Sequence, residues 1–296
     1  GQIWYNDTSN KIRVNTIKPA AWASGGNLNT GRAGLGGAGI QTAALAFGGN
    51  TPSLNETEEY NGSSWSEQNN LNTGRFYGGG FGSQTAAVMA GGIVQTAGTR
   101  NLNNSEEYNG TSWSEGNNLT TGRDILSGAG TLTAGLCFGG FEPGNSAKTE
   151  EYNGTSWSEQ NDLNTVVRGS SRAGIQTSAL SFGGDGPAPG VQIATEEYDG
   201  TSWTTGADYP VAQEAGSGSS GPQTAALGFG GYTTNTTNKY DGTSWTATAN
   251  MATARGGLGG DGTNDTSAIA FGGAPSRNIT EEFTNIVNAV TSLDVS

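Results

Sequence analysis

The sequence contains no histidine, and only one of its 296 residues is a cysteine. The absence of histidine excludes the commonest general base, histidine-dependent catalytic triads and most zinc and copper sites. Cys137 lies in the apolar stretch 133–140 (TAGLCFGG) and has no second cysteine to pair with, which predicts a buried, unreactive thiol. We therefore expect no catalytic residue, no metal ion and no bound cofactor.

Positive charge and long apolar runs are also scarce. The chain has 13 Lys and Arg against 26 Asp and Glu, a net charge of −13, which disfavours nucleic acid as a partner. The chain has no apolar run of the roughly 18 residues that a membrane-spanning helix needs, so we expect no membrane insertion. The sequence starts at Gly1 rather than at Met, which suggests a processed or excerpted chain.

The chain is instead rich in glycine, with 51 residues, and in internal repeats. The phrase EEYNGTSW recurs with few changes at 58–65, 106–113, 150–157, 196–203 and 238–245. A tryptophan occupies one equivalent place in six units: Trp22, Trp65, Trp113, Trp157, Trp203 and Trp245. Ten residues after the tryptophan, four of the units have an arginine: Arg32, Arg75, Arg123 and Arg255. A Gly-Gly pair closes each of the six units.

The sixth repeat is divided between the two ends of the chain. Phe283 stands in the tyrosine place of a phrase that has no tryptophan after it, and Trp22 precedes Arg32 by the usual ten residues. A closed ring explains this division, because the N-terminal strand can complete the last unit.

The repeat length and the local signals predict an all-β fold, a six-bladed β-propeller of four-stranded antiparallel blades. The mean spacing of about 45 residues is typical of propeller blades. Asn-Gly and Asp-Gly pairs between the tyrosine and tryptophan predict tight hairpins, and short apolar runs before each Gly-Gly predict buried strands. We expect an N-terminal β-hairpin at 1–17, the propeller at 18–285 with its last blade closed by the N-terminal strand, and a C-terminal strand or tail at 286–296 that could pair with the hairpin.

The repeated Glu-Glu pair and the repeated arginine vary together. Blade five has lost both, with Gln213 and Asn238-Lys239 in their places, while blade four keeps its glutamates and shifts its arginine by one residue, to Arg168. We expect the arginines and glutamates to meet, either as structural bridges within the blades or as a functional charged ring at the channel mouth.

The order Gly-Gly, Tyr, Trp, Arg resembles the kelch repeat over residues 18–285, and the Asn/Gly/Thr-rich composition is similar to kelch-like proteins of tailed, especially marine, bacteriophages. The element GQIWYNDTSNKIRV resembles one found before terminal domains of phage tail fibres. Kelch propellers are mostly recognition platforms. The chain lacks the histidines of the galactose-oxidase type, and its TEEYDGTSW stretches lack the spacing of the sialidase Asp box. A glycosidase using the four arginines is the enzymatic alternative.

These observations predict a non-enzymatic phage virion appendage, a tail fibre or capsid-surface protein, located on the virion surface or outside the cell. Its partner would be a host-surface glycan or another virion protein, and a homo-oligomer is an open alternative. A bacterial extracellular polysaccharide-binding or adhesive propeller is the second hypothesis.

The connection from the second to the third strand varies most in length and carries the candidate binding face. The loops 93–105 and 185–195 should be tallest, with 141–149 beside them. The candidate binding residues are Arg100, Asn101, Asn103, Asn145, Asp185 and Gln192. The alternative is that these loops are merely unconstrained.

Overall fold

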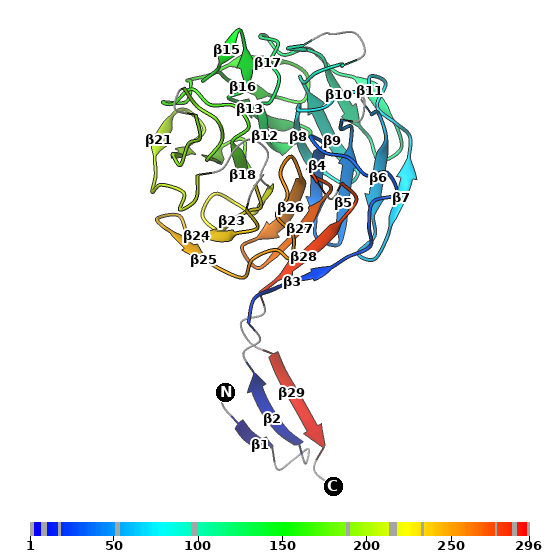
Figure 1. Cartoon of the computed structure of the whole chain (residues 1–296), viewed down its shortest axis with the longest axis vertical. Helices are drawn as coiled ribbons and strands as arrows, with labels where there is room; N and C mark the ends of the chain where they lie inside the picture. Colours follow the sequence, from blue (N-terminus) through cyan, green and yellow to red (C-terminus); the bar gives the residue numbers. More distant parts are fainter. Residues whose placement is uncertain are drawn as a thin grey trace.

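The computed structural model shows a ring of six four-stranded antiparallel sheets, the blades of a β-propeller (Figure 1). The structure describes residues 3–6, 11–16, 19–50, 54–95, 100–187, 190–212, 218–231, 234–275, 277–285 and 289–294. Within these ranges no helix is long and apolar enough to cross a membrane. The predicted fold class is confirmed.

Each blade runs outward from the ring axis through four strands. The innermost strands of blades one to six are β4 (Gly36–Ile40), β8 (Gly79–Ser83), β12 (Ser127–Thr131), β18 (Ser171–Ile175), β22 (Gly218–Ser220) and β26 (Gly259–Asn264). The second strands are β5 (Ala43–Phe47), β9 (Ala86–Ala90), β13 (Ala134–Phe138), β19 (Ser178–Phe182), β23 (Ala226–Phe229) and β27 (Ser267–Phe271).

The repeated EEY phrase forms the third strands and the tryptophans begin or lie in the outermost ones. The third strands are β6 (Thr57–Tyr60), β10 (Ser105–Tyr108), β16 (Thr149–Tyr152), β20 (Thr195–Tyr198), β24 (Thr237–Tyr240) and β28 (Thr280–Thr284). The outer strands are β7 (Trp65–Gln68), β11 (Trp113–Glu115), β17 (Trp157–Glu159), β21 (Trp203–Thr205), β25 (Trp245–Ala247) and, for blade six, β3 (Ala21–Ser24).

Blade six is completed by the N-terminal strand. β3 pairs antiparallel with β28, and Trp22 lies opposite Phe283 as the divided repeat predicts. The Trp22 ring also packs against Phe229 of blade five, with 5.0 Å between centroids. The first and last parts of the propeller sequence are therefore joined in one sheet.

Small residues on the innermost strands make room for the aromatic residues at the ends of the second strands. A Cβ on Gly36 would lie 2.3 Å from the Phe47 ring, so no larger residue fits there without a shift. Blade two has Ala90 where the other second strands end in phenylalanine, and Phe81 of its innermost strand packs against Trp157 instead, at 6.3 Å between centroids. The core is distributed between neighbouring blades.

A chain of backbone hydrogen bonds runs around the inner end of the blades. The N–H of Gly34 donates to Gly257, that of Tyr77 to Gly34, that of Ile125 to Tyr77 and that of Gly169 to Ile125, at 2.7 to 2.8 Å. Tyr77 and Ile125 adopt left-handed backbone conformations here, with φ of 57° and 53°. This conformation is uncommon for non-glycine residues and unfavourable for a β-branched one, so the ring imposes it on both.

A second, three-stranded sheet lies outside the ring (Figure 1). The predicted N-terminal hairpin consists of β1 (Ile3–Asn6) and β2 (Lys11–Thr16). β29 (Ala289–Asp294) pairs with β2, from Lys11 opposite Asp294 to Thr16 opposite Ala289. The two ends of the chain thus meet in one sheet, in addition to the closure of blade six.

Candidate functional site

In four blades, the first glutamate of the repeated phrase binds the repeated arginine of its own blade. The pairs Arg32–Glu58, Arg75–Glu106, Arg123–Glu150 and Arg255–Glu281 have N···O distances of 2.6 to 3.0 Å. All eight side chains are buried, with at most 3% exposure. Glu58 also accepts hydrogen bonds from the backbone N–H groups of Asn29 and Thr30, in the linker between blades. These pairs hold the blade and its linker together and are too enclosed to meet a ligand.

Blades four and five replace this pair differently. In blade four, Val167 occupies the arginine place and is buried, while Arg168 is partly exposed and pairs with Asp185 instead of Glu196. The interpretation of Arg168 as the repeat arginine shifted by one residue is therefore wrong, because the next residue along points away from the blade interior. In blade five, Asn238 donates to the Tyr209 hydroxyl at 3.2 Å.

The second glutamate of each phrase accepts a hydrogen bond from the tyrosine of the next blade. The pairs are Tyr60–Glu282, Tyr108–Glu59, Tyr152–Glu107, Tyr198–Glu151 and Tyr240–Glu197. At the one remaining boundary, Lys239 stands in the glutamate place and Phe283 in the tyrosine place. Both partners are lost together. Lys239 instead pairs with Asp265 at 2.7 Å.

The tryptophan indole N–H groups form a third set of ties between blades. Five of them donate to a threonine hydroxyl of the preceding blade at 2.9 to 3.1 Å: Trp22 to Thr237, Trp65 to Thr280, Trp113 to Thr57, Trp203 to Thr149 and Trp245 to Thr195. Trp157 is the exception, since its Nε1 is buried without a partner. The equivalent hydroxyl is that of Ser105, which donates to the Asn117 carbonyl. The repeat signature as a whole serves the scaffold.

The candidate site lies where the chain enters and leaves the inner strands. In five blades, the residue after the arginine place forms an isolated β-bridge with the residue after Gly-Gly: Ala33–Asn50, Phe76–Ile93, Asp124–Phe141, Arg168–Asp185 and Gly256–Ala274. Among these five blades, charged side chains occupy the bridge positions in blades three and four. The bridges hold the two backbone positions alike in these blades, so the chemistry at the bridge differs between blades through its side chains.

Arg100 and Asn101 extend from the blade-two loop onto blade three. Arg100 is 54% exposed and donates to the buried Asp124 carboxylate at 3.1 and 3.3 Å. The Asn101 amide nitrogen, turned toward blade three, lies 2.9 Å from Asp124 Oδ2 and 3.0 Å from the Phe141 carbonyl. Burial raises the pKa of the Asp124 carboxyl, and Arg100 opposes that shift.

Phe141 lies between the two charged pairs. The guanidinium carbons of Arg100 and Arg168 are each 5.5 Å from the centre of its ring, a distance suited to cation–π attraction. Asn145, in the hairpin formed by β14 (Phe141–Glu142) and β15 (Gly144–Asn145), donates to the Asp185 carbonyl at 3.0 Å. Seven residues from three consecutive blades thus form one cluster, which we term the platform: Arg100, Asn101, Asp124, Phe141, Asn145, Arg168 and Asp185.

The predicted binding residues divide into two groups. Arg100, Asn101, Asn145 and Asp185 belong to the platform. Within the described part of the chain, Asn103 and Gln192 do not join its hydrogen bonds: Asn103 accepts from the Leu119 N–H, and Gln192 donates to Gly190 of its own loop. Residues 96–99 and 188–189 of the two tallest predicted loops lie outside the described residues.

The described parts of these loops form hydrogen bonds to the following blade. Arg100 and Asn145 each bond the following blade, and Arg277 of blade six does the same to Asn50 of blade one, at 2.8 Å. Of the platform residues, Asp124 and Phe141 were not singled out in the sequence, and Arg168 was assigned to the repeat rather than to binding. Comparing the two bridge positions across the repeats is the signal that would have found them.

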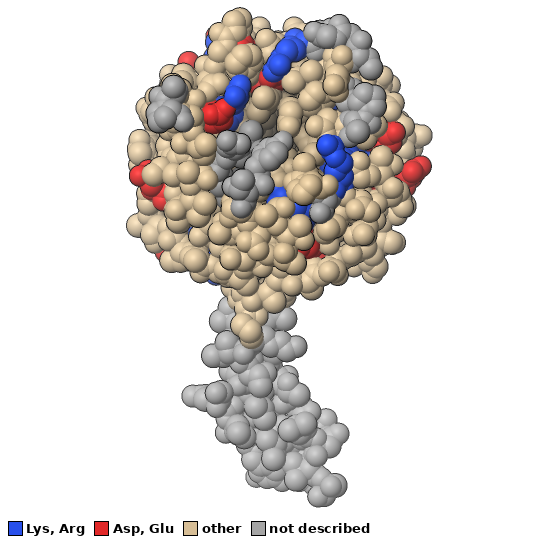
Figure 2. All heavy atoms as spheres, viewed as in Figure 1, with Lys and Arg blue, Asp and Glu red and all other residues tan. Residues whose placement is uncertain are grey.

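The surrounding surface carries little charge. Figure 2 shows a face that is mostly uncharged, with single basic groups, several of them beside acidic ones. Among the described residues, no three His, Cys, Asp or Glu side chains are grouped as metal ligands would be. Cys137 is fully buried, and burial raises the pKa of its thiol to about 12.

Comparisons with known proteins identify the fold alone. No family model matches the chain, and a search of the curated proteins found no match. Among solved structures, one described as the structure of YjhT is similar, with a TM-score of 0.74 and 13% sequence identity. The match covers 90% of this chain and 99% of that one. The chain is a six-bladed β-propeller.

Proposed function

We propose that this propeller is a non-enzymatic recognition module on the surface of a tailed-phage virion, part of a tail fibre or capsid surface. Its partner in this proposal is a host-surface glycan or another virion protein. The kelch-like order of Gly-Gly, Tyr, Trp and Arg and the fibre-like N-terminal element support the assignment to this class.

The platform is the observation that carries the proposal. Aromatic and arginine side chains are enriched where proteins recognise partners, and rigid scaffolds commonly carry recognition on their loops. Here Phe141 and two guanidiniums come together from three blades, while the repeat residues are occupied in holding the ring. The hydrogen bonds to Asp124 and Asp185 orient both arginines in advance, which lowers the entropy lost on binding.

The amides and carboxylates of the platform suit a polyhydroxylated ligand. Asn101 and Asn145 provide amide groups, and Asp185 and Arg168 provide acceptors and donors in fixed positions, as needed to bond several hydroxyls at once. The ring of Phe141 adds an apolar surface. A neutral or weakly anionic surface polysaccharide therefore fits better than nucleic acid, given the net charge of −13.

Competition for adsorption tests this function. Purified full-length protein, added in excess to host cells before infection, should slow phage adsorption and should bind the cells saturably. Antibodies against the propeller should label particles in electron micrographs. If the antibodies label bacteria instead of particles, the bacterial adhesive protein is favoured. If the antibodies do not label particles and the purified protein does not bind cells, both hypotheses are contradicted.

A further inference from the structure

The innermost strands enclose two cavities on the ring axis. The larger, about 280 Å³, is lined by residues near the C-terminal ends of the innermost strands of blades two to six, among them Gly82, Gly130, Gly174 and Gly262. The smaller, about 70 Å³, is lined by residues before those strands, including Gly34, Tyr77 and Ile125. The smaller cavity lies on the platform side of the ring, since its lining includes Ile125 and Gly169, which follow Asp124 and Arg168. The larger cavity lies on the opposite side, beside the turns that join the first and second strands of the blades.

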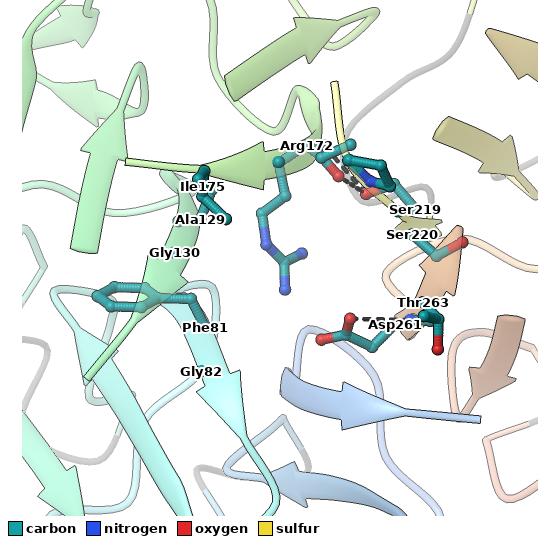
Figure 3. A pocket seen from close by; sticks show the side chains of 17 residues that line it. Phe81, Gly82, Ala129, Gly130, Arg172, Ile175, Ser219, Ser220, Asp261 and Thr263 are labelled. Atoms are coloured by element: carbon teal, nitrogen blue, oxygen red, sulfur yellow. Dashed lines mark hydrogen bonds between the residues drawn. The ribbon is translucent and has the colours of Figure 1, made fainter. Parts of the chain in front are cut away.

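Arg172 belongs to both cavities. It is the second residue of β18, where the equivalent residues of the other blades are Gly37, Gly80, Gly128, Ser219 and Gly260. Its side chain extends into the centre of the channel, as Figure 3 shows. Nη2 donates to the carbonyl of Gly37 at 3.3 Å, on blade one, which is opposite blade four in a ring of six. One arginine thus bridges the channel.

The Arg172 guanidinium has more N–H donors than the described residues provide acceptors for. It has five N–H groups, and the Gly37 carbonyl is the acceptor that the described residues provide, at a long distance. Among the described side chains, none forms an ion pair with Arg172 within the distances found for the other arginines. A partly buried cation without a close counter-ion favours the binding of an anion beside it, so an anion in the cavity would be well placed to bind Arg172.

Two oxygen-bearing side chains line the same cavity, one from blade five and one from blade six. Asp261 of β26 and Ser220 of β22 occupy the third strand position, which is Ala38, Phe81, Ala129 and Ala173 in the other blades. Asp261 Oδ1 accepts from the N–H of Gly262 at 2.8 Å, and its carboxyl group projects into the cavity (Figure 3). Ser220 is 3% exposed, and none of the described residues forms a hydrogen bond with its hydroxyl.

We propose that the 280 Å³ cavity binds a small organic carboxylate that also carries a hydroxyl or amino group. Arg172 would hold the carboxylate through its planar pair of N–H groups, a geometry that matches carboxylate oxygens. Asp261 would accept from the hydroxyl or amino group, and Ser220 would donate to a ligand oxygen. A phosphate carries up to about two negative charges, so an ionised Asp261 would repel it more strongly than a ligand with a single carboxylate, which favours the carboxylate.

Calorimetric titration of the full-length protein tests the site. Gluconate, which has a carboxylate and hydroxyls, should bind to the wild type, while glucose and inorganic phosphate should bind at least tenfold more weakly. Propionate, which lacks the hydroxyls, should also bind more weakly. Arg172→Gln should weaken gluconate binding by at least about tenfold, as expected for the loss of charged hydrogen bonds.

The matched control is Arg277→Gln, which removes an arginine that belongs to neither the cavity nor the platform and should leave gluconate affinity unchanged. Because Arg172 also bonds blade one, Ser220→Ala serves as a second variant that keeps that bond and should weaken binding severalfold. Failure of gluconate to bind the wild type, equal binding of phosphate, or unchanged affinity in both Arg172→Gln and Ser220→Ala would overturn the proposal. The site and the platform are independent, so loss of one leaves the other proposal standing.

Discussion

The hydroxyl of Tyr108 donates a hydrogen bond to Oε1 of Glu59, in the preceding blade, at 3.1 Å. Burial, and then the charge of Glu59, raise the pKa of Tyr108 to about 12, so the phenol stays a donor over the usual pH range. The same pair forms at five of the six blade boundaries. At the sixth, between blades five and six, Lys239 and Phe283 stand in its place.

This boundary permits a double-mutant cycle. Lys239→Glu and Phe283→Tyr should each destabilise, since the first removes the Lys239–Asp265 pair and the second buries a hydroxyl without an acceptor. Together they should form the hydrogen bond found elsewhere, with a coupling free energy of about 1–2 kcal/mol from urea denaturation. Strict additivity of the two changes would show that the tie does not form there.

Ser105→Thr should stabilise the ring. Trp157 Nε1 is buried without a partner, and the equivalent hydroxyl in five other units belongs to a threonine that accepts the indole N–H. A methyl group that turns the hydroxyl toward the indole should raise the free energy of unfolding by about 1 kcal/mol. The reverse change in another blade, Thr149→Ser, is the control and should lower it. No gain at Ser105 would mean that its bond to Asn117 is worth as much.

The two kinds of arginine should differ in their effect on stability. Arg123 is fully buried and donates to Glu150, Gly139 and Lys148, so Arg123→Ala leaves a buried carboxylate unpaired and should destabilise by about 3–5 kcal/mol. Arg168 and Asp185 are partly exposed, and Arg168→Ala should change stability by less than about 1 kcal/mol. Thermal unfolding of both variants distinguishes them. Equal melting temperatures would contradict a structural role for the buried pairs.

Stability should depend on pH through Asp261. Burial raises its pKa from 3.8 to about 7, against the opposing effect of Arg172 across the channel. A carboxyl with a raised folded-state pKa favours the folded protein while protonated, so its contribution declines as pH rises from about 4 to 7 and stays low above. Asp261→Asn should therefore be more stable than the wild type at pH 8, by about 1–2 kcal/mol after allowing for solvent in the channel. The two proteins should converge at pH 4; an unchanged difference between pH 4 and pH 8 would contradict the assignment to Asp261.

The ring architecture was readable from the sequence because every blade repeats the same physical signals. The divided sixth repeat predicted the pairing of Trp22 with Phe283, and the joint loss of Arg and Glu in blade five predicted that they meet. The joint substitutions at Lys239 and Phe283 also carried a signal for the tyrosine–glutamate hydrogen bonds. Recognising that signal requires knowing that the tyrosine of one blade contacts the glutamate of the preceding blade.

Other features could not be read from single positions. The left-handed backbone of Ile125 contradicts the local preference of a β-branched residue and follows from hydrogen bonds to neighbouring blades. Arg168 is one residue from the repeat position, yet it pairs with Asp185 on the platform, while Val167 beside it is buried in the core. Arg172 stands out only when the six innermost strands are aligned, because its significance lies in the glycines that surround it.

Recognition by the platform is the central claim, and one binding comparison tests it most directly. Binding of labelled full-length protein to an array of bacterial surface polysaccharides would be measured for the wild type, for Arg100→Ala/Arg168→Ala and for Arg277→Ala. Arg277 joins blades six and one as Arg100 joins blades two and three, so it is a matched control. We predict that the double variant binds the polysaccharides at least about tenfold more weakly than the wild type, and that Arg277→Ala binds them as the wild type does. Undiminished binding by the folded double variant would contradict the account.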